Sequence, residues 1–571
     1  MSNVPARLMR HAWLVAIAVA YLYVFPHFPR IHSANELPRV YLVKAIVEDH
    51  SFAIDTGVKR WGGTADVSPG RDGHSYSNKA PGSSLLVVPI YALVRLVGEP
   101  SLGKTLWICR VVAGVIPALL FLLLLWRFLE RYAPDEAVRR LVLIAYALGS
   151  LAMTYALLFY SHQLAAICIA SAWIFAVDVA EGKGGTRAMI AAGLLAGAAP
   201  LVDYQAAFAG VPVAVYVLVA MRTRKRELVR ALLVMMASAA IPIAILLWYH
   251  AVCFGSPLRT GYDASKTFAH FHQQGFLGMT RPHADAFVGS FIKPDNGLLV
   301  LSPWLLFAIP GGIVLWRRGE RAVTIVAAAV ALIFILFISS ITFWRGGWGV
   351  GPRYVTAMLP FLLPLVAAAL TALRDRTLLL GALCGTIVSS VVIYCASAAT
   401  FPYWPDSLKN PLYEVTFRLI GDREAAPNAA SLLFGLSAFA SAIPFLLGVA
   451  ALLGWALVRV VGVRGTLAAV GVGAVIIVAF AFAPRTGIEA TRAYAWTLLP
   501  AVKGHDLSEN ERMALFADDM CRCKTARCAQ DVSDHMIRWS KESPKPTPSE
   551  PVSDELLRLA KCHQRAMTEP Y

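Results

Sequence analysis

The chain consists of long apolar stretches separated by short polar turns. A helix needs about 20 apolar residues to cross the hydrocarbon core of a membrane. Since lipid offers the backbone no hydrogen-bond partners, each stretch is expected to satisfy its own polar groups as a helix. The pattern predicts an all-α polytopic membrane protein with about 13 spanning helices. The expected spans cover residues 12–28, 105–125, 141–160, 163–180, 187–203, 206–221, 229–249, 301–316, 321–341, 355–373, 377–396, 430–458 and 464–483.

Lys and Arg gather in the short turns, as they do in cytoplasmic loops. Assigning those turns to the cytoplasm puts the N-terminus inside and the C-terminus outside, and residues 12–28 become an uncleaved first span rather than a signal peptide. The apolar run 82–98 is short and contains Pro89 and Arg95. The first span ends outside and the next basic turn is assigned to the cytoplasm, so only one of the runs 82–98 and 105–125 can cross the membrane. The first run is therefore predicted to be a juxtamembrane or re-entrant helix on the outer side.

The same pattern divides the chain into two regions. Residues 1–483 form the transmembrane region, and residues 484–571 form an external tail with two helical patterns, 507–541 and 552–568, predicted to pair as a hairpin. The large external loops of the first region are 29–104, 250–300 and 397–428.

Composition agrees with a membrane protein. Hydrophobic residues make up 57% of the chain and charged residues 15%, whereas soluble proteins carry about 25% charged residues. The net charge of +16 comes from cations in the turns. It therefore marks membrane topology and does not indicate a nucleic-acid partner.

Four of the nine cysteines lie in the polar tail, at Cys521, Cys523, Cys528 and Cys562. An even number in a small external segment favours two disulfides. Zinc is the alternative, since this spacing also suits a tetrahedral site. The predicted external location favours disulfides, and three pairings remain open.

Unusual polar residues converge on the predicted outer face, which we therefore expect to be the working surface. Lys79 stands where a polar loop meets an apolar run, a position useful for meeting an anion at the membrane surface. The candidate residues on this side are Glu36, Arg39, Asp55, Lys79, His162, Asp203, Tyr204, Arg345, Arg353 and Tyr354.

The first external loop resembles that of the GT-C glycosyltransferases, more narrowly the bacterial members related to protein O-mannosyltransferases and to the lipid A aminoarabinose transferase. In these proteins an Asp-Glu pair followed by Arg opens the loop. The letters here are "NELPR", so Glu36 and Arg39 match and Asn35 replaces the Asp.

Two later motifs continue this resemblance, which covers roughly residues 1–370. The family's "KPP" segment resembles "NKAPG", with Lys79 in the lysine position and Ala80 departing from the pattern. The "GPRY" before an apolar stretch resembles a family "RY" element at Arg353 and Tyr354. Each motif alone is a weak signal. The resemblance depends on the order of the motifs and on their shared location at the predicted outer face.

The resemblance implies an inverting transfer of a sugar from a polyprenyl-phosphate donor to an extracytoplasmic acceptor, at the outer face of a bacterial inner membrane. Glu36 would be the general base, and Lys79, Arg353 and Arg345 would stabilise the departing lipid phosphate. The remaining candidates would bind substrate: Arg39, Asp55, His162, Asp203, Tyr204 and Tyr354. The expected partners are the donor, membrane lipids and an acceptor that is a lipid, glycan or protein.

No cofactor is implied. A divalent cation is possible but not indicated, since no carboxylate completes a ligand set with His270 and His272.

Several of these residues also have an ordinary structural explanation. Glu36 could be an acid at a helix N-terminus, and Lys79 could reach to the lipid headgroups. Arg353 could anchor a span, while His162 and Asp203 could be interfacial or capping residues. The rival functions are a polymerase or ligase using polyprenyl-diphosphate glycans and, third, a transporter, for which no internal repeat is visible.

Overall fold

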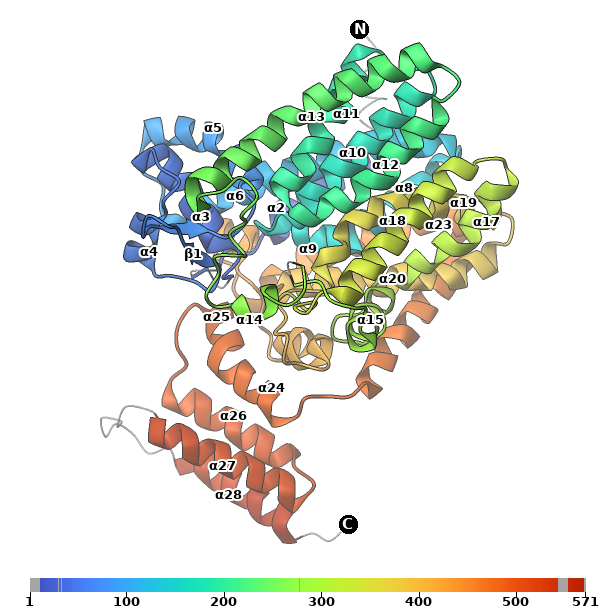
Figure 1. The fold of residues 1–571 in the computed structure, drawn as a ribbon. Helices are drawn as coiled ribbons and strands as arrows, with labels where there is room; N and C mark the ends of the chain where they lie inside the picture. Colours follow the sequence, from blue (N-terminus) through green and yellow to red (C-terminus); the bar gives the residue numbers. More distant parts are fainter. Residues whose placement is uncertain (1–10, 29, 32, 277, 543–552, 569–571) are drawn as a thin grey trace.

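The computed structural model describes residues 11–28, 30–31, 33–276, 278–542 and 553–568, and its regular structure is almost entirely helical. Figure 1 shows the long helices packed side by side, with the first external segment along one flank and the C-terminal tail projecting away from the bundle. The helices of the bundle are α2 (Ala12–Val24), α7 (Ile116–Phe128), α8 (Glu136–Leu148), α9 (Leu151–Leu157), α10 (His162–Ala180), α11 (Thr186–Val202), α12 (Ala207–Ala220), α13 (Lys225–Phe254), α17 (Ala308–Arg317), α18 (Arg321–Ser340), α19 (Leu359–Ala372), α20 (Thr377–Thr400) and α23 (Ile443–Ala479).

Seven helices among the described residues are long and apolar enough to cross a membrane, or eight if the bent pair α8 and α9 is one span. The protein is therefore a multi-pass helical membrane protein. Shorter apolar helices accompany the long ones, so the predicted total of 13 spans stays a prediction. The shorter ones are Ala12–Val24, Gly82–Val97, Thr186–Val202, Tyr204–Ala220 and Pro303–Arg317.

Turns that the sequence assigns to the cytoplasm contact one another. Arg131 pairs with Asp178 and, at 3.1 Å, with Glu181. Arg374, from a third turn, lies 2.9 Å from Asp135. These contacts join turns far apart in the chain, as the predicted alternation of spans requires.

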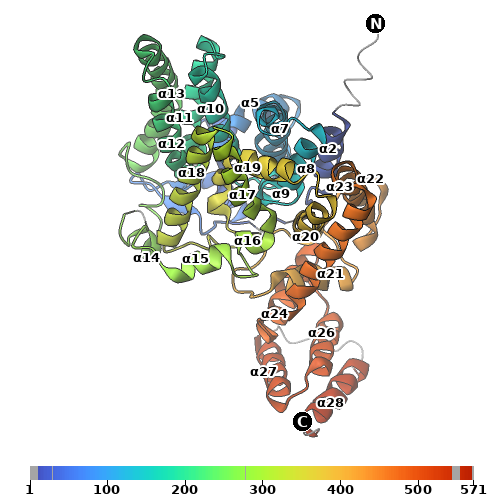
Figure 2. The same ribbon diagram turned by 90° about the vertical axis from the view of Figure 1, so that its right-hand side faces the viewer.

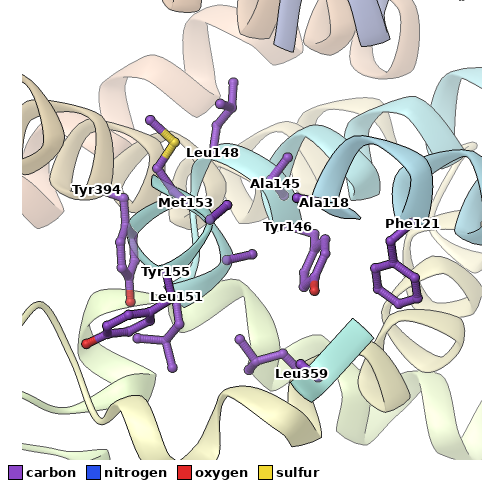
Figure 3. Close-up of a cluster of buried hydrophobic side chains, with 14 of the residues drawn as sticks. Ala118, Phe121, Ala145, Tyr146, Leu148, Leu151, Met153, Tyr155, Leu359 and Tyr394 are labelled. Atoms are coloured by element: carbon purple, nitrogen blue, oxygen red, sulfur yellow. The ribbon is translucent and has the colours of Figure 1, made fainter. Parts of the chain in front are cut away.

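A break between α8 and α9 lies inside the core and bends the chain by 56°. Ser150 caps α9, and the carbonyl of Gly149 accepts hydrogen bonds from Trp304 Nε1 at 2.8 Å and Ser302 Oγ at 3.2 Å. A buried backbone carbonyl without partners would be costly, so these two donors make the break tolerable. Figure 3 shows the apolar side chains around it, including Leu148, Leu151 and Met153.

The predicted span 430–458 begins later than expected. A short helix, α22 (Ala429–Phe434), ends at Gly435, whose φ of 67° is left-handed, and α23 begins only at Ile443. Helix α23 then runs past the predicted cytoplasmic turn, where Gly462 breaks the helical geometry with φ 68° and ψ 179°. The apolar residues of α22 therefore form a separate short helix that precedes the long helix α23.

The first external loop folds into short helices and one hairpin. The predicted juxtamembrane run is helix α5, and the predicted span 105–125 lies within a longer continuous helical segment, Leu102–Arg131. The elements of the loop are α3 (Glu36–Lys44), α4 (Asp55–Trp61), β1 (Val67–Pro69), β2 (Ser75–Ser77), α5 (Gly82–Val97) and α6 (Leu102–Arg110). In the loop 250–300 the regular elements are α14 (Ala269–His272), α15 (Ala284–Phe291) and the start of α16 (Leu298–Leu301).

The tail begins with two short helices, α24 (Ile488–Ala493) and α25 (Leu499–Lys503), and then forms three longer helices where the sequence predicts two. The predicted helix 507–541 is divided into α26 (Glu509–Arg522) and α27 (Ala526–Glu542), and α28 (Ser553–Thr568) packs against both. Figure 2 shows the three as a separate small bundle. The predicted disulfides are confirmed, as Cys521–Cys562 and Cys523–Cys528. The hairpin expectation is therefore corrected to a cross-linked three-helix unit.

Candidate active site

Five separate parts of the chain enclose a cavity of about 260 Å³ on the side of the first external loop. We call it the first cavity. Its walls are aromatic and its charged groups are two cations and one carboxylate. Its lining residues are Ser33, Ala34, Asn35, Asp66, Lys79, Tyr160, Tyr262, Phe268, His272, Phe343, Gly346, Gly347, Trp348, Arg353, Tyr354 and Tyr403.

The hairpin of β1 and β2 brings Lys79 to Asp66. Val67 pairs with Ser77, so the residues just outside this pair are adjacent. The Nζ atom of Lys79 lies 2.8 Å from Asp66 Oδ1, and both residues are more than nine-tenths buried. Asn78 Nδ2 also donates to Oδ1, at 3.5 Å, so neither donor uses Oδ2 of Asp66.

Tyr262, from the loop 250–300, completes the surroundings of Lys79. The ammonium lies 5.0 Å from the ring centroid and 3.4 Å from the hydroxyl. Burial lowers the pKa of Lys79, and the neighbouring charge of Asp66 opposes that shift. The lysine therefore lies within the protein, beside an acid, rather than extended into the lipid headgroups.

Arg353 is the second cation of the first cavity. It donates to the carbonyl of Gly346, and its Nε has no hydrogen-bond partner among the described residues. Its guanidinium lies 5.2 Å from the ring centroid of Tyr160 and 5.5 Å from that of Tyr354. Gly346 has φ 69°, and a Cβ there would lie 2.9 Å from Arg353 Nε. The glycine turn "RGGWGVGPRY" thus makes room for the arginine.

Glu36 does not line the first cavity, although its neighbour Asn35 does. Its side chain is fully buried and accepts four hydrogen bonds. Arg110 donates from Nε at 2.8 Å and from Nη2 at 2.9 Å, the Tyr403 hydroxyl donates at 2.8 Å, and the backbone N–H of Phe159 donates at 2.7 Å. A carboxylate has about four acceptor positions, so none remains for an acceptor hydroxyl. This geometry fits a structural ion pair and does not fit the predicted general base.

Arg39, a predicted substrate residue, also makes structural contacts. It donates to the Asn35 side chain at 3.2 Å, to the Ala80 carbonyl at 3.3 Å, to Ser83 at 2.9 Å and to Ser161 at 3.0 Å. These bonds join α3 to the loop that carries Lys79 and to the start of α10.

Two further candidates lie outside the lining of the first cavity. Arg345 pairs with Asp295. Asp55 caps the far side of the hairpin, 2.7 Å from His74 Nδ1 and 3.0 Å from the Ser75 N–H. Neither is positioned for the phosphate or sugar contacts that the sequence predicts.

His162, Asp203 and Tyr204 lie behind the cavity wall. His162 Nδ1 is 2.6 Å from Asp203 Oδ2, and its ring packs edge-on against Tyr354 with centroids 5.7 Å apart. The Tyr204 hydroxyl is 2.8 Å from His250 Nε2. His162 thus supports the wall at Tyr354, and Tyr204 packs against Tyr262, another lining residue, with ring centroids 6.0 Å apart.

Several lining residues were missed from the sequence, above all Asp66. A signal was present: "PGRDGHSYS" has an Asp-Gly pair with Gly73 at φ 85°, between segments able to alternate as strands. An Asp-Gly turn is a strong hairpin signal. Pairing outward from it would have brought residue 66 close to residues 78 and 79.

The histidines of the loop 250–300 do not assemble a metal site within the described part of the chain. His272 lines the first cavity. No group of three or more His, Cys, Asp or Glu side chains able to hold a metal occurs among the described residues.

Comparison with known proteins identifies the fold. The chain is similar to ArnT from Cupriavidus metallidurans bound to undecaprenyl phosphate, with 15% sequence identity and a TM-score of 0.50 over 91% of this chain and 81% of that one. The apo structure of the same protein gives a TM-score of 0.48, and an Archaeoglobus fulgidus oligosaccharyltransferase gives 0.46, with 65% of its length covered. No protein-family profile matches the chain, and no curated protein matches it in sequence.

The likeness to ArnT shows that the chain shares the fold of that protein, as the predicted resemblance expected. At 15% identity it establishes the fold alone, so chemistry must be argued from this chain's own cavity.

Proposed function

We propose that this protein is an inverting glycosyltransferase that moves a sugar from a polyprenyl-phosphate donor to an acceptor hydroxyl at the outer face of the membrane. One observation carries the proposal. Two buried cations, Lys79 and Arg353, share one small aromatic cavity with a single carboxylate, Asp66, among its described lining residues. The GT-C fold supports the same assignment.

The cations suit the phosphate of the donor. Charge develops on the leaving phosphate in the transition state, and positioned donors in a site shielded from water stabilise it strongly. Lys79 offers a compact ammonium, and Arg353 offers a guanidinium Nε–H without another described partner. In this proposal Arg345 is left out of phosphate binding, since it pairs with Asp295.

Asp66 suits the general base. The acceptor oxygen attacks the anomeric carbon of the sugar while the bond from that carbon to the phosphate oxygen breaks. The acceptor proton passes to Asp66 Oδ2, and the polyprenyl phosphate leaves with the bonding electrons. Donor phosphate also competes with Asp66 for Lys79, which raises the capacity of the carboxylate to accept that proton. Single displacement gives inversion.

The size of the first cavity favours one sugar over a long glycan. At about 260 Å³ it is smaller than most ligand pockets, which hold about 300–1,000 Å³. Aromatic faces at Tyr160, Tyr262 and Trp348 are suited to stacking on a sugar ring. A polymerase using polyprenyl-diphosphate oligosaccharides is the weaker alternative for this reason.

Helix α5 offers a path for the polyprenyl chain. It begins three residues after Lys79, and Leu86, Ile90, Leu93 and Val97 are exposed along it. Their spacing of four, three and four residues puts them on one face of the helix. A lipid chain lying along this face would keep its phosphate near Lys79.

The same proposal locates the site at the periplasmic surface of a bacterial inner membrane, with the N-terminus in the cytoplasm and the disulfide-bonded tail outside. The support is that the basic turns contact one another away from the first cavity, as the positive-inside rule expects. Disulfides in the tail also suit an oxidising compartment.

The test compares Asp66→Asn with Asp55→Asn, a matched acid-to-amide change at a residue of α4 that contacts the same hairpin but does not line the first cavity. Removing a general base costs about 100- to 10,000-fold in rate. We expect Asp66→Asn to bind polyprenyl phosphate but to lose transfer by that factor, and Asp55→Asn to transfer normally. Normal turnover by Asp66→Asn would refute the base assignment.

A further inference from the structure

A second, larger cavity of about 760 Å³ lies on the other side of Tyr403 from the first. Tyr403 lines both cavities. Its hydroxyl donates to Glu36, and Glu36 binds Arg110, which also lines the second cavity. The buried Glu36–Arg110–Tyr403 cluster therefore forms part of the partition between two sites.

The rim of the second cavity carries apolar side chains exposed to the surroundings. Trp107 of α6 is 42% exposed and Leu432 of α22 is 60% exposed, and both line the cavity. Leu433 and Phe434 follow in α22 at 74% and 75% exposure. Four such side chains in a membrane protein are suited to contact lipid chains.

Backbone contacts hold α22 beside this cavity. The N–H of His27 donates to the Pro427 carbonyl at 2.8 Å, and Asn428 caps the helix with a capping box. A capping box fixes the N-terminus of a helix. The apolar residues of α22 are thus fixed at the mouth by the segment that follows α2.

The interior of the cavity is not purely apolar. Arg30 and Ser101, which are exposed, and half-buried His27 line it together with aliphatic and aromatic side chains. A polyprenyl chain whose phosphate lies near Lys79 has no other polar group to meet Arg30. The exposed side chains of α5 are apolar and suit that chain better. The mixture fits an amphiphile with a hydrocarbon chain and an anionic headgroup.

We infer that the second cavity binds the acceptor, and that this acceptor is a membrane lipid with an anionic headgroup. Its chain would lie against α6 and α22, its anion near Arg30, and its headgroup hydroxyl would reach the donor sugar past Tyr403. The inference rests on the proposed function, because it is the transfer reaction that requires a second substrate.

A bulky substitution at Gly103 tests whether a lipid occupies the second cavity. Gly103 lines the cavity, and a Cβ built there meets nothing within 4 Å. Gly103→Trp places a large ring into this space, and Gly103→Ala is the matched control because it adds a Cβ without filling the cavity. Arg30→Gln removes the charge alone.

The experiment measures binding of two probes to the full-length protein by native mass spectrometry, dioleoyl phosphatidic acid for the acceptor and undecaprenyl phosphate for the donor. We expect simultaneous binding of one molecule of each. Gly103→Trp and Arg30→Gln should each weaken phosphatidic acid binding by about tenfold or more, leaving undecaprenyl phosphate unchanged. Gly103→Ala should behave like the parent protein.

Three outcomes would overturn the inference. Loss of undecaprenyl phosphate in Gly103→Trp would mean that the cavity holds the donor chain. Phosphatidic acid binding that is absent, or insensitive to both substitutions, would mean that no anionic lipid binds there. Transfer to a soluble protein at the parent rate by Gly103→Trp would indicate a protein acceptor. Lys79→Gln tests the proposed function separately. Undiminished binding of undecaprenyl phosphate to this variant would refute the donor site, whereas the measurements on the second cavity would be unaffected.

Discussion

The ammonium group of Lys79 lies 2.8 Å from the carboxylate of Asp66 inside the first cavity. We propose that Lys79 stabilises the departing phosphate and that Asp66 accepts the proton of the incoming hydroxyl. While they bind each other, neither is fully available. Arrival of a donor phosphate would separate them, so donor binding and activation of the base are coupled through this one contact.

Substitution of the two cations should weaken donor use. Lys79→Gln removes a charge-assisted bond worth about 1.5–3 kcal/mol, or about 10- to 150-fold in affinity or rate. Arg353→Gln should show a similar loss, and the double variant should be less than additive if both cations contact one phosphate. Transfer from a defined polyprenyl-phosphate sugar measures all three variants. Lys79→Gln with the kinetics of the parent protein would contradict the donor site.

Glu36→Gln should lower the stability of the folded protein rather than remove a catalytic group. It would leave the guanidinium of Arg110 buried beside a neutral amide, and breaking a buried ion pair costs about 3–5 kcal/mol. We expect a lower thermal midpoint in detergent. Combining it with Arg110→Gln should cost less than the sum of the two single changes. A Glu36→Gln protein that melts normally but transfers at least about 100-fold more slowly would restore Glu36 as the base.

Alkaline pH should separate binding from stability. Burial lowers the pKa of Lys79 from its ordinary 10.5, so this ammonium loses its proton before an exposed lysine would, and donor affinity should fall as the pH rises toward 10.5. Between the two pKa values the unfolded chain binds more protons, so the contribution of Lys79 to stability rises with pH. Lys79→Arg should keep whatever donor affinity it has across that range, since guanidinium stays protonated. Parallel pH profiles for the two proteins would contradict the role of the ammonium.

The two disulfides should differ in their contribution to the tail. In the loop-entropy description, closing the 41-residue separation of Cys521 and Cys562 is worth about 4 kcal/mol, and the five-residue separation of Cys523 and Cys528 about 2 kcal/mol. Paired Cys→Ser changes, followed by limited proteolysis of the tail, measure the difference. Mass spectrometry of the non-reduced protein should find all four thiols unavailable to alkylation. Four free thiols would contradict the pairing and the external location together.

The class of membrane protein and most of the long helices could be predicted from the amino-acid sequence. Apolar runs near twenty residues can satisfy their backbone in lipid only as helices, so their lengths predicted the class and the elements. The disulfide-bonded tail followed from four cysteines in one polar segment. Lys79 was found because a cation at the edge of an apolar run is unusual, and Arg353 was found through the "GPRY" motif before an apolar stretch.

Which acid lies beside those cations could be seen only in the folded protein. Glu36 and Asp66 are both acids in one polar loop, and the amino-acid sequence does not show which of them lines a cavity. A hairpin of two short strands turns Asp66 toward Lys79, while Arg110, 74 residues from Glu36 in the chain, takes up the other carboxylate. The same holds for Tyr403, which reaches Glu36 across 367 residues. Local patterns fix elements through short-range periodicity, whereas a site depends on contacts between distant segments that no local pattern encodes.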